Sequence, residues 1–61
     1  MAQITAKELT AIEDMLAIEH NLVAKYYEYA SKTEDPALKS MYEQTALRHQ
    51  RHYDELYYNL K

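Results

Sequence analysis

Glu19, His49 and His52 are the residues of this sequence whose types and spacing indicate chemistry. Each stands where a repeating pattern of apolar residues would otherwise continue. His49 and His52 are three residues apart, so on a helix their imidazoles are neighbours on one face. Ionisable groups are costly in a protein core unless they are paired or bind a metal ion. A carboxylate with two imidazoles therefore indicates a polar layer that is hydrogen-bonded internally or holds a divalent metal ion.

Two long helices are predicted to bring these residues together. The first is expected over about residues 6–31 and the second over about residues 36–60, because apolar residues recur in both at alternating spacings of three and four. These stripes are Leu9, Ile12, Leu16, Glu19, Val23, Tyr26 and Ala30 in the first helix, and Tyr42, Ala46, His49, Tyr53, Leu56 and Leu60 in the second. If the chain reverses near residue 34, residue 19 faces residue 49 across an antiparallel hairpin.

Capping signals predict where the helices begin. Thr5 and Glu8 have the spacing of a capping box, in which each side chain accepts a hydrogen bond from the backbone N–H of the other residue. Asp35 is expected to cap the second helix, with Pro36 at its first position, where the missing N–H of proline does no harm. Residues 32–35 therefore form the turn.

The apolar surface of this hairpin is wider than one partner helix can cover. Further apolar residues flank the two stripes: Met15, Leu22 and Tyr29 in the first helix, and Leu38 and Met41 in the second. A chain of 61 residues without cysteine has a small core and no disulfide to support it. We therefore expect an all-α fold in which residues 1–61 form a two-helix antiparallel hairpin that homodimerises into a four-helix bundle, or assembles further. The alternatives are a monomer with an exposed patch and a hairpin that pairs with another protein.

Composition argues against several classes of partner. Ten acidic residues outnumber seven basic ones, and the net charge of −3 disfavours nucleic acid or an anionic membrane surface. No apolar run approaches the roughly 18 residues of a membrane span. The segment Met1–Ile4 lacks the charged and apolar regions of a secretory signal. We therefore expect an intracellular protein that is not secreted by a signal peptide.

Seven tyrosines are present, with no phenylalanine or tryptophan. Their ordinary role is packing, with the ring between the helices and the hydroxyl at water or a polar partner. Tyr26 and Tyr42 face each other across the predicted hairpin, so we expect them to stack in the layer next to the polar residues.

Three segments resemble a known family: Glu19–Ala30 (EHNLVAKYYEYA), Asp35–Leu38 (DPAL) and Ala46–His52 (ALRHQRH). Together they resemble one half of a ferritin-like or rubrerythrin-like helical bundle, and more closely the small bacterial spore coat proteins of the coat F type. The resemblance implies a structural, self-associating protein without catalytic residues, in the cytoplasm or the spore coat, with other coat proteins as partners. The alternative is a ferritin-like metal-binding protein.

In metal-binding ferritin-like proteins, one helix supplies a Glu and the next a Glu-x-x-His. By this resemblance Glu19 matches the first Glu and His52 the His, whereas His49 stands where the second Glu is found. The two carboxylates of a dimer neutralise one divalent ion, zinc or iron, rather than a pair of ions. His20, next to Glu19, is expected to orient the site by a hydrogen bond. The alternatives are a metal-free polar layer and histidines that simply reach solvent.

Overall fold

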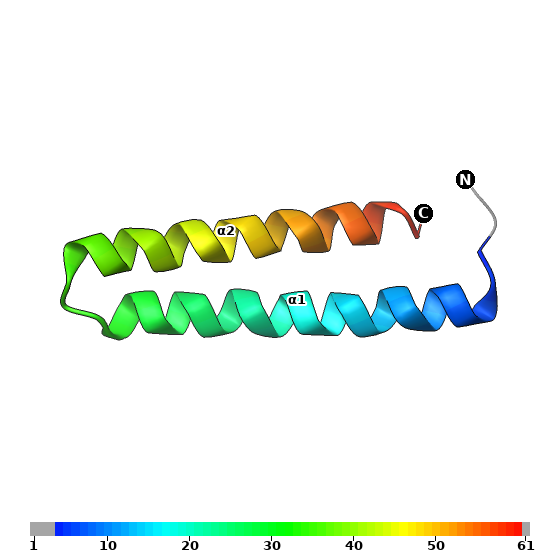
Figure 1. The fold of residues 1–61 in the computed structure, drawn as a ribbon, viewed down its shortest axis with the longest axis horizontal. Coiled ribbons are helices and arrows are strands. Elements are labelled where there is room, and N and C mark those ends of the chain that lie inside the picture. Colours follow the sequence, from blue (N-terminus) through cyan, green and yellow to red (C-terminus); the bar gives the residue numbers. More distant parts are fainter. Residues whose placement is uncertain (1–3, 61) are drawn as a thin grey trace.

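A computed structural model describes residues 4–60 and shows two helices, α1 (Ala6–Lys32) and α2 (Pro36–Tyr58), with no strand among those residues. Residues 1–3 and 61, which the sequence analysis included in the domain, lie outside the described residues. The helices run antiparallel and side by side (Figure 1), so the expected all-α helical hairpin is confirmed. Its extents are 46 × 16 × 11 Å, which makes it a plate with two broad faces.

α1 begins with the predicted capping box. Thr5 Oγ1 accepts a hydrogen bond from the Glu8 N–H, and Glu8 Oε1 accepts one from the Thr5 N–H, each at 3.0 Å. The hydrogen bond from the Thr5 backbone also lowers the pKa of Glu8. Because the first turn of a helix leaves its N–H groups without partners, these bonds define the start of α1.

α1 ends at Lys32, close to the predicted end. Lys32 Nζ donates a hydrogen bond of 2.7 Å to Glu28 Oε1, one turn earlier. This hydrogen bond, together with the attraction between the charges, lowers the pKa of Glu28 and raises the pKa of Lys32. A cation in the last turn is also favoured by the helix dipole, which supports the helix up to this residue.

α2 begins as predicted. Asp35 caps the helix, because its Oδ1 accepts hydrogen bonds from the N–H of Ala37 at 2.8 Å and of Leu38 at 3.2 Å. Pro36 occupies the first turn, where its missing N–H leaves no carbonyl without a partner. The turn between the helices is therefore specified by its own residues.

α2 ends at Tyr58, two residues before the predicted end at about residue 60. Asn59 Nδ2 donates a hydrogen bond of 3.0 Å to the Glu55 carbonyl. The N–H of Leu60 donates to the Tyr57 carbonyl at 3.0 Å, three residues back rather than four. This tighter hydrogen bond ends the α-helix while apolar periodicity still continues in the sequence.

The two helices meet along a narrow seam formed by the two apolar stripes. Of the described residues, Ala30 and Ala46 are buried, and no large side chain is fully buried. The other residues of the stripes are half-buried, except Leu9, which is exposed. The chain exposes 4943 Å², compared with about 4,200 Å² for a compact monomer of this mass. A single hairpin therefore lacks a closed core.

The seam separates the two broad faces, which we name by the histidine that each contains. On each helix, residues seven apart occupy the same face. The His52 face contains Met15, Leu22 and Tyr29 of α1 and Leu38, Thr45 and His52 of α2. The His20 face contains Glu13, His20 and Tyr27 of α1 and Glu43, Gln50 and Tyr57 of α2. Two separate grooves agree with this division, since one is lined by Met15 and His52 and the other by His20 and Tyr53.

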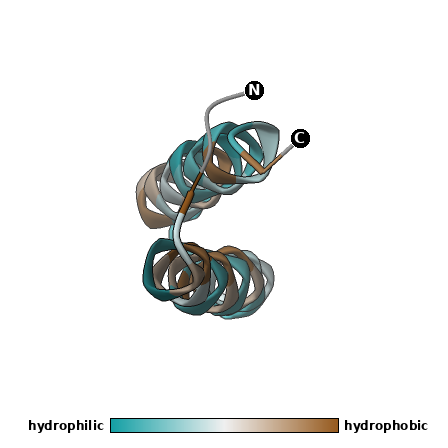
Figure 2. Cartoon of the chain, turned by 90° about the vertical axis from the view of Figure 1, so that its right-hand side faces the viewer, coloured by the Kyte–Doolittle hydropathy of each residue, from teal (hydrophilic) through white to brown (hydrophobic). Residues whose placement is uncertain are grey.

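The outer surfaces of both helices are largely hydrophilic in the end-on view of Figure 2. In the described part of the chain, neither helix combines the length and the apolar character that a membrane crossing requires. Exposed apolar side chains that gather on one broad face therefore indicate a surface that contacts another molecule.

Candidate functional site

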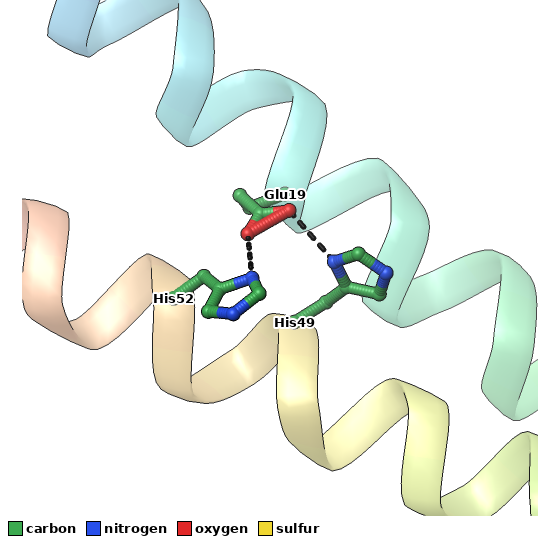
Figure 3. A group of neighbouring side chains, drawn as sticks. All are labelled: Glu19, His49 and His52. Carbon is green, nitrogen blue, oxygen red and sulfur yellow. Dashed lines mark hydrogen bonds and ion pairs between the residues drawn. The ribbon is translucent and has the colours of Figure 1, made fainter.

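Glu19 contacts both histidines across the seam (Figure 3). Its Oε1 lies 2.8 Å from His49 Nδ1, and its Oε2 lies 2.8 Å from His52 Nδ1. α1 thus supplies the carboxylate and α2 supplies two imidazoles from neighbouring turns. An ionised carboxylate only accepts hydrogen bonds, so each Nδ1 carries a proton and donates it. The structure brings together the three residues that the sequence singled out.

Exposure of these side chains increases from the seam outward. The exposed fraction is 12% for Glu19, 22% for His49 and 46% for His52. Within residues 4–60, no buried side-chain nitrogen or oxygen lacks a hydrogen-bond partner. The polar layer is therefore satisfied inside one hairpin, and His52 forms its open edge.

Aromatic packing holds the His49 ring. It stacks on Tyr26, with 6.0 Å between the ring centroids and 7° between the planes, and it meets the His52 ring edge-on at 5.5 Å. The expected stack of Tyr26 on Tyr42 is wrong, because these rings are 6.2 Å apart and tilted by 32°. Tyr42 also contacts Tyr29 at 5.5 Å, and Tyr26 lies parallel to His49 instead. Packing and hydrogen bonding thus fix the same imidazole.

The Glu19, His49 and His52 group can hold a metal ion, because one ligand atom from each lies within 4.8 Å of the others. In a tetrahedral zinc site with bonds of about 2.0–2.1 Å, ligand atoms lie roughly 3.3 Å apart. The 2.8 Å contacts therefore have to open by roughly 0.5 Å, and each coordinating Nδ1 has to give up its proton. Three ligands leave a fourth position for water or for a group from another molecule.

A groove on the His52 face gives solvent access to the polar layer. Its volume is about 280 Å³, and it is lined by Met15, Glu19, His52, Glu55, Leu56 and Asn59. The sequence analysis missed Glu55, although it follows His52 by three residues and so lies one turn away on the same side of α2. Among residues 4–60 its carboxylate forms no ion pair. Glu55 therefore adds an unpaired negative charge beside the open edge of the layer.

His20 lies outside the polar layer. Its ring is 6.4 Å from the Tyr53 ring, and both residues line a groove of about 340 Å³ together with Leu16, Ala17 and Asn21. The expected hydrogen bond from His20 to the site is therefore wrong. Successive residues of a helix point about 100° apart, so a residue next to Glu19 leaves the seam for the His20 face.

Comparisons with known proteins gave no match to this chain among protein-family models, curated proteins or solved structures. The resemblance to ferritin-like bundles and to coat proteins of the coat F type stays a prediction from the sequence. Arguments about function therefore depend on the geometry of the hairpin and its polar layer.

Proposed function

We propose that this protein is a small structural protein that self-associates into a homodimeric four-helix bundle with the Glu19, His49 and His52 layer in its core. The observation that supports this proposal is the apolar surface left on one hairpin. Five exposed large hydrophobic side chains lie on the His52 face or at its edge: Met15, Ile18, Tyr29, Leu38 and Met41. Patches of this kind on a chain without a closed core mark sites of association.

A second hairpin is the right size to cover this surface. Each broad face measures 46 × 16 Å between the outermost Cα atoms, or about 700 Å². Stable interfaces bury about 800 Å² on each partner. Covering apolar surface contributes about 25 cal/mol per Å², and it would also complete the burial of His52.

Sedimentation equilibrium tests the self-association. We expect a dimer at tens of micromolar, with a melting temperature that rises with protein concentration because unfolding is coupled to dissociation. A monomer at these concentrations, with a melting temperature independent of concentration, contradicts the proposal.

Binding of a divalent metal is the second candidate function, supported by the convergence of one carboxylate and two imidazoles. We propose one zinc or iron ion per dimer, because imidazole-rich sites suit these metals and the two Glu19 carboxylates of a dimer neutralise one divalent charge. The competing metal-free layer is supported by the two 2.8 Å hydrogen bonds that already satisfy Glu19.

Thermal unfolding with added metal separates these two alternatives. A metal site should raise the melting temperature at pH 7.5 and have little effect at pH 5, because a protonated imidazole has no lone pair to give to a metal ion. The double substitution His49→Leu and His52→Leu should abolish this shift, while His20→Leu should keep it. If zinc, iron, nickel and copper all leave the wild-type melting temperature unchanged, the metal-free layer is the correct description.

A role beside other coat proteins, in the spore coat or the cytoplasm, is the broadest part of the proposal and is supported by the sequence resemblance. Under this proposal the chain has no catalytic residues and acts by assembly. Localisation of a tagged chain in a sporulating cell, with recovery of bound coat proteins, tests it directly. A chain found in growing cells and bound to none of them contradicts it.

A further inference from the structure

We infer that the second copy docks on the His52 face about a two-fold axis that lies in the interface, parallel to this face and perpendicular to the helices. The axis crosses each α2 between Arg51 and His52 and brings the two His52 rings together. This inference rests on the proposed self-association and assigns its surface and register. The argument comes from charged residues along the His52 face that form no ion pair within residues 4–60 of the single hairpin. In a two-fold interface every contact occurs twice, so a correct axis must pair two sets of charges at once.

Arg48 and Glu55 are the first pair of charges. Both continue the heptad spacing of Met41 along the edge of the His52 face. Within residues 4–60 neither side chain forms an ion pair. They are seven residues, or about 10 Å, apart along α2, too far for an ion pair with each other. When two α2 helices lie antiparallel about this axis, Arg48 of each copy lies opposite Glu55 of the other.

Glu8 and Lys25 of α1 are a second pair of opposite charges, and the point midway between them marks where the axis crosses α1. Both lie at heptad spacing from apolar residues of this face, Glu8 from Met15 and Lys25 from Ile18. The point midway between Glu8 and Lys25 falls between residues 16 and 17. These two residues line a groove with Tyr53, the residue after His52, so both midpoints lie at one level of the hairpin.

Two exposed apolar residues of α1, Met15 and Ile18, fit the same axis. It places Met15 of one copy opposite Ile18 of the other, and these side chains are 49% and 57% exposed in the single hairpin. Apolar contact therefore forms at the centre of the α1 pair, with Glu8 and Lys25 toward its ends. An apolar centre with a charged rim is the usual arrangement of a protein interface.

The polar layer gains a residue in this arrangement. His52 lies within one residue of the axis, and its half-exposed ring faces the second copy. Glu19 lies about 4 Å along α1 from the same level, so the two layers overlap rather than stack end to end. Each groove beside His52 is then closed by His52 of the other copy. The layer seen in one hairpin is half of a site with two carboxylates and four imidazoles.

Charge reversal and charge exchange test the register. Arg48→Glu and Glu55→Arg should each weaken the dimer roughly 10- to 100-fold, because each replaces two attractions by two repulsions. The double variant Arg48→Glu and Glu55→Arg should return to within about threefold of wild type. Glu43→Arg makes the same charge change as Glu55→Arg, but on the His20 face, and should leave dimerisation unchanged.

The outcomes separate the register from the self-association itself. A wild-type dimer in which the double variant stays as weak as the single variants overturns the register and leaves the self-association intact. A wild-type monomer overturns both.

Cross-linking provides a second test, because the chain has no cysteine of its own. His52→Cys should give a covalent dimer with a short bifunctional maleimide, and His20→Cys should not. Circular dichroism first establishes that both variants are helical, and sedimentation that both are dimers. Efficient cross-linking at position 20, or none at position 52 in a dimeric protein, overturns the inference.

Discussion

The His52 face and the His20 face occupy equivalent positions on either side of one seam, yet they differ in almost every side chain. Four of the six heptad positions on the His52 face are apolar, whereas the His20 face has Glu13, Glu43 and Gln50 among its six. His52 lies 2.8 Å from a carboxylate of the facing helix, whereas the His20 ring packs beside Tyr53 at 6.4 Å. One residue type thus has two roles, decided by the direction in which its helix points it.

The difference has a simple physical consequence. Water can solvate Glu13, Glu43 and Gln50 of the His20 face in a single hairpin, so these side chains need no further partner. On the His52 face, Met15, Leu38 and Met41 are exposed to water in the single hairpin. The free energy of the protein falls when another surface covers such apolar side chains. The comparison therefore predicts that substitutions of one kind have unequal effects on the two faces.

The largest difference is expected for carboxylates introduced on each face. Met15→Glu with Ile18→Glu should weaken the dimer at least about 100-fold, because it places unpaired charges at the centre of the proposed interface. Tyr27→Glu with Gln50→Glu, at exposed positions of the His20 face, should have little effect. Sedimentation equilibrium measures both; equal dissociation of the two double variants would contradict the assignment of the His52 face.

The next effect concerns Glu19 against Glu13. Glu19→Ala should destabilise the protein by about 2–3 kcal/mol, because it removes the acceptor of two hydrogen bonds within the seam. Glu13→Ala, one of the exposed positions of the His20 face, should change stability by less than about 0.5 kcal/mol. Urea denaturation at fixed protein concentration gives both values. A Glu19→Ala variant as stable as wild type would show that the polar layer contributes nothing.

A smaller effect separates the two histidines that name the faces. His52→Leu should cost about 1 kcal/mol, since it removes one of the two hydrogen bonds of Glu19 and leaves the bond to His49 in place. His20→Leu should stay within about 0.5 kcal/mol of wild type, because His20 only packs beside Tyr53. Urea denaturation measures the stability of both variants. A greater loss of stability for His20→Leu than for His52→Leu would contradict this prediction.

The smallest effect is expected outside both faces, at Glu28 and Lys32. Their ion pair is exposed, so Glu28→Gln should lower the melting temperature only slightly in low salt and not measurably in high salt. The lowered pKa of Glu28 means that the contribution is present above its unfolded-state pKa of about 4.3 and is lost as the pH falls through the folded-state value. The raised pKa of Lys32 means that the contribution is fully present below the unfolded-state pKa of Lys32 and is lost as the pH rises through its higher folded-state value. Melting curves across this pH range provide the check.

Much of the hairpin was determined by local sequence. The capping box at Thr5, the cap at Asp35 and the apolar spacing of three and four act within one or two helical turns, so they specify two helices without tertiary information. The same periodicity placed Glu19 opposite His49. The same spacing also predicts that His20 lies outside the seam and that Glu55 lies one turn from His52, although the sequence analysis drew neither conclusion.

Tertiary structure alone decided how the side chains of the polar layer meet. The stacking of Tyr26 on His49 rather than on Tyr42, and the rise in exposure from Glu19 to His52, depend on the offset between the helices and on side-chain rotamers. A heptad pattern fixes which side of its own helix a residue occupies. It does not fix the rotation of the facing helix by a fraction of a turn, and a shift of that size determines which imidazole lies in the seam and which lies at its edge.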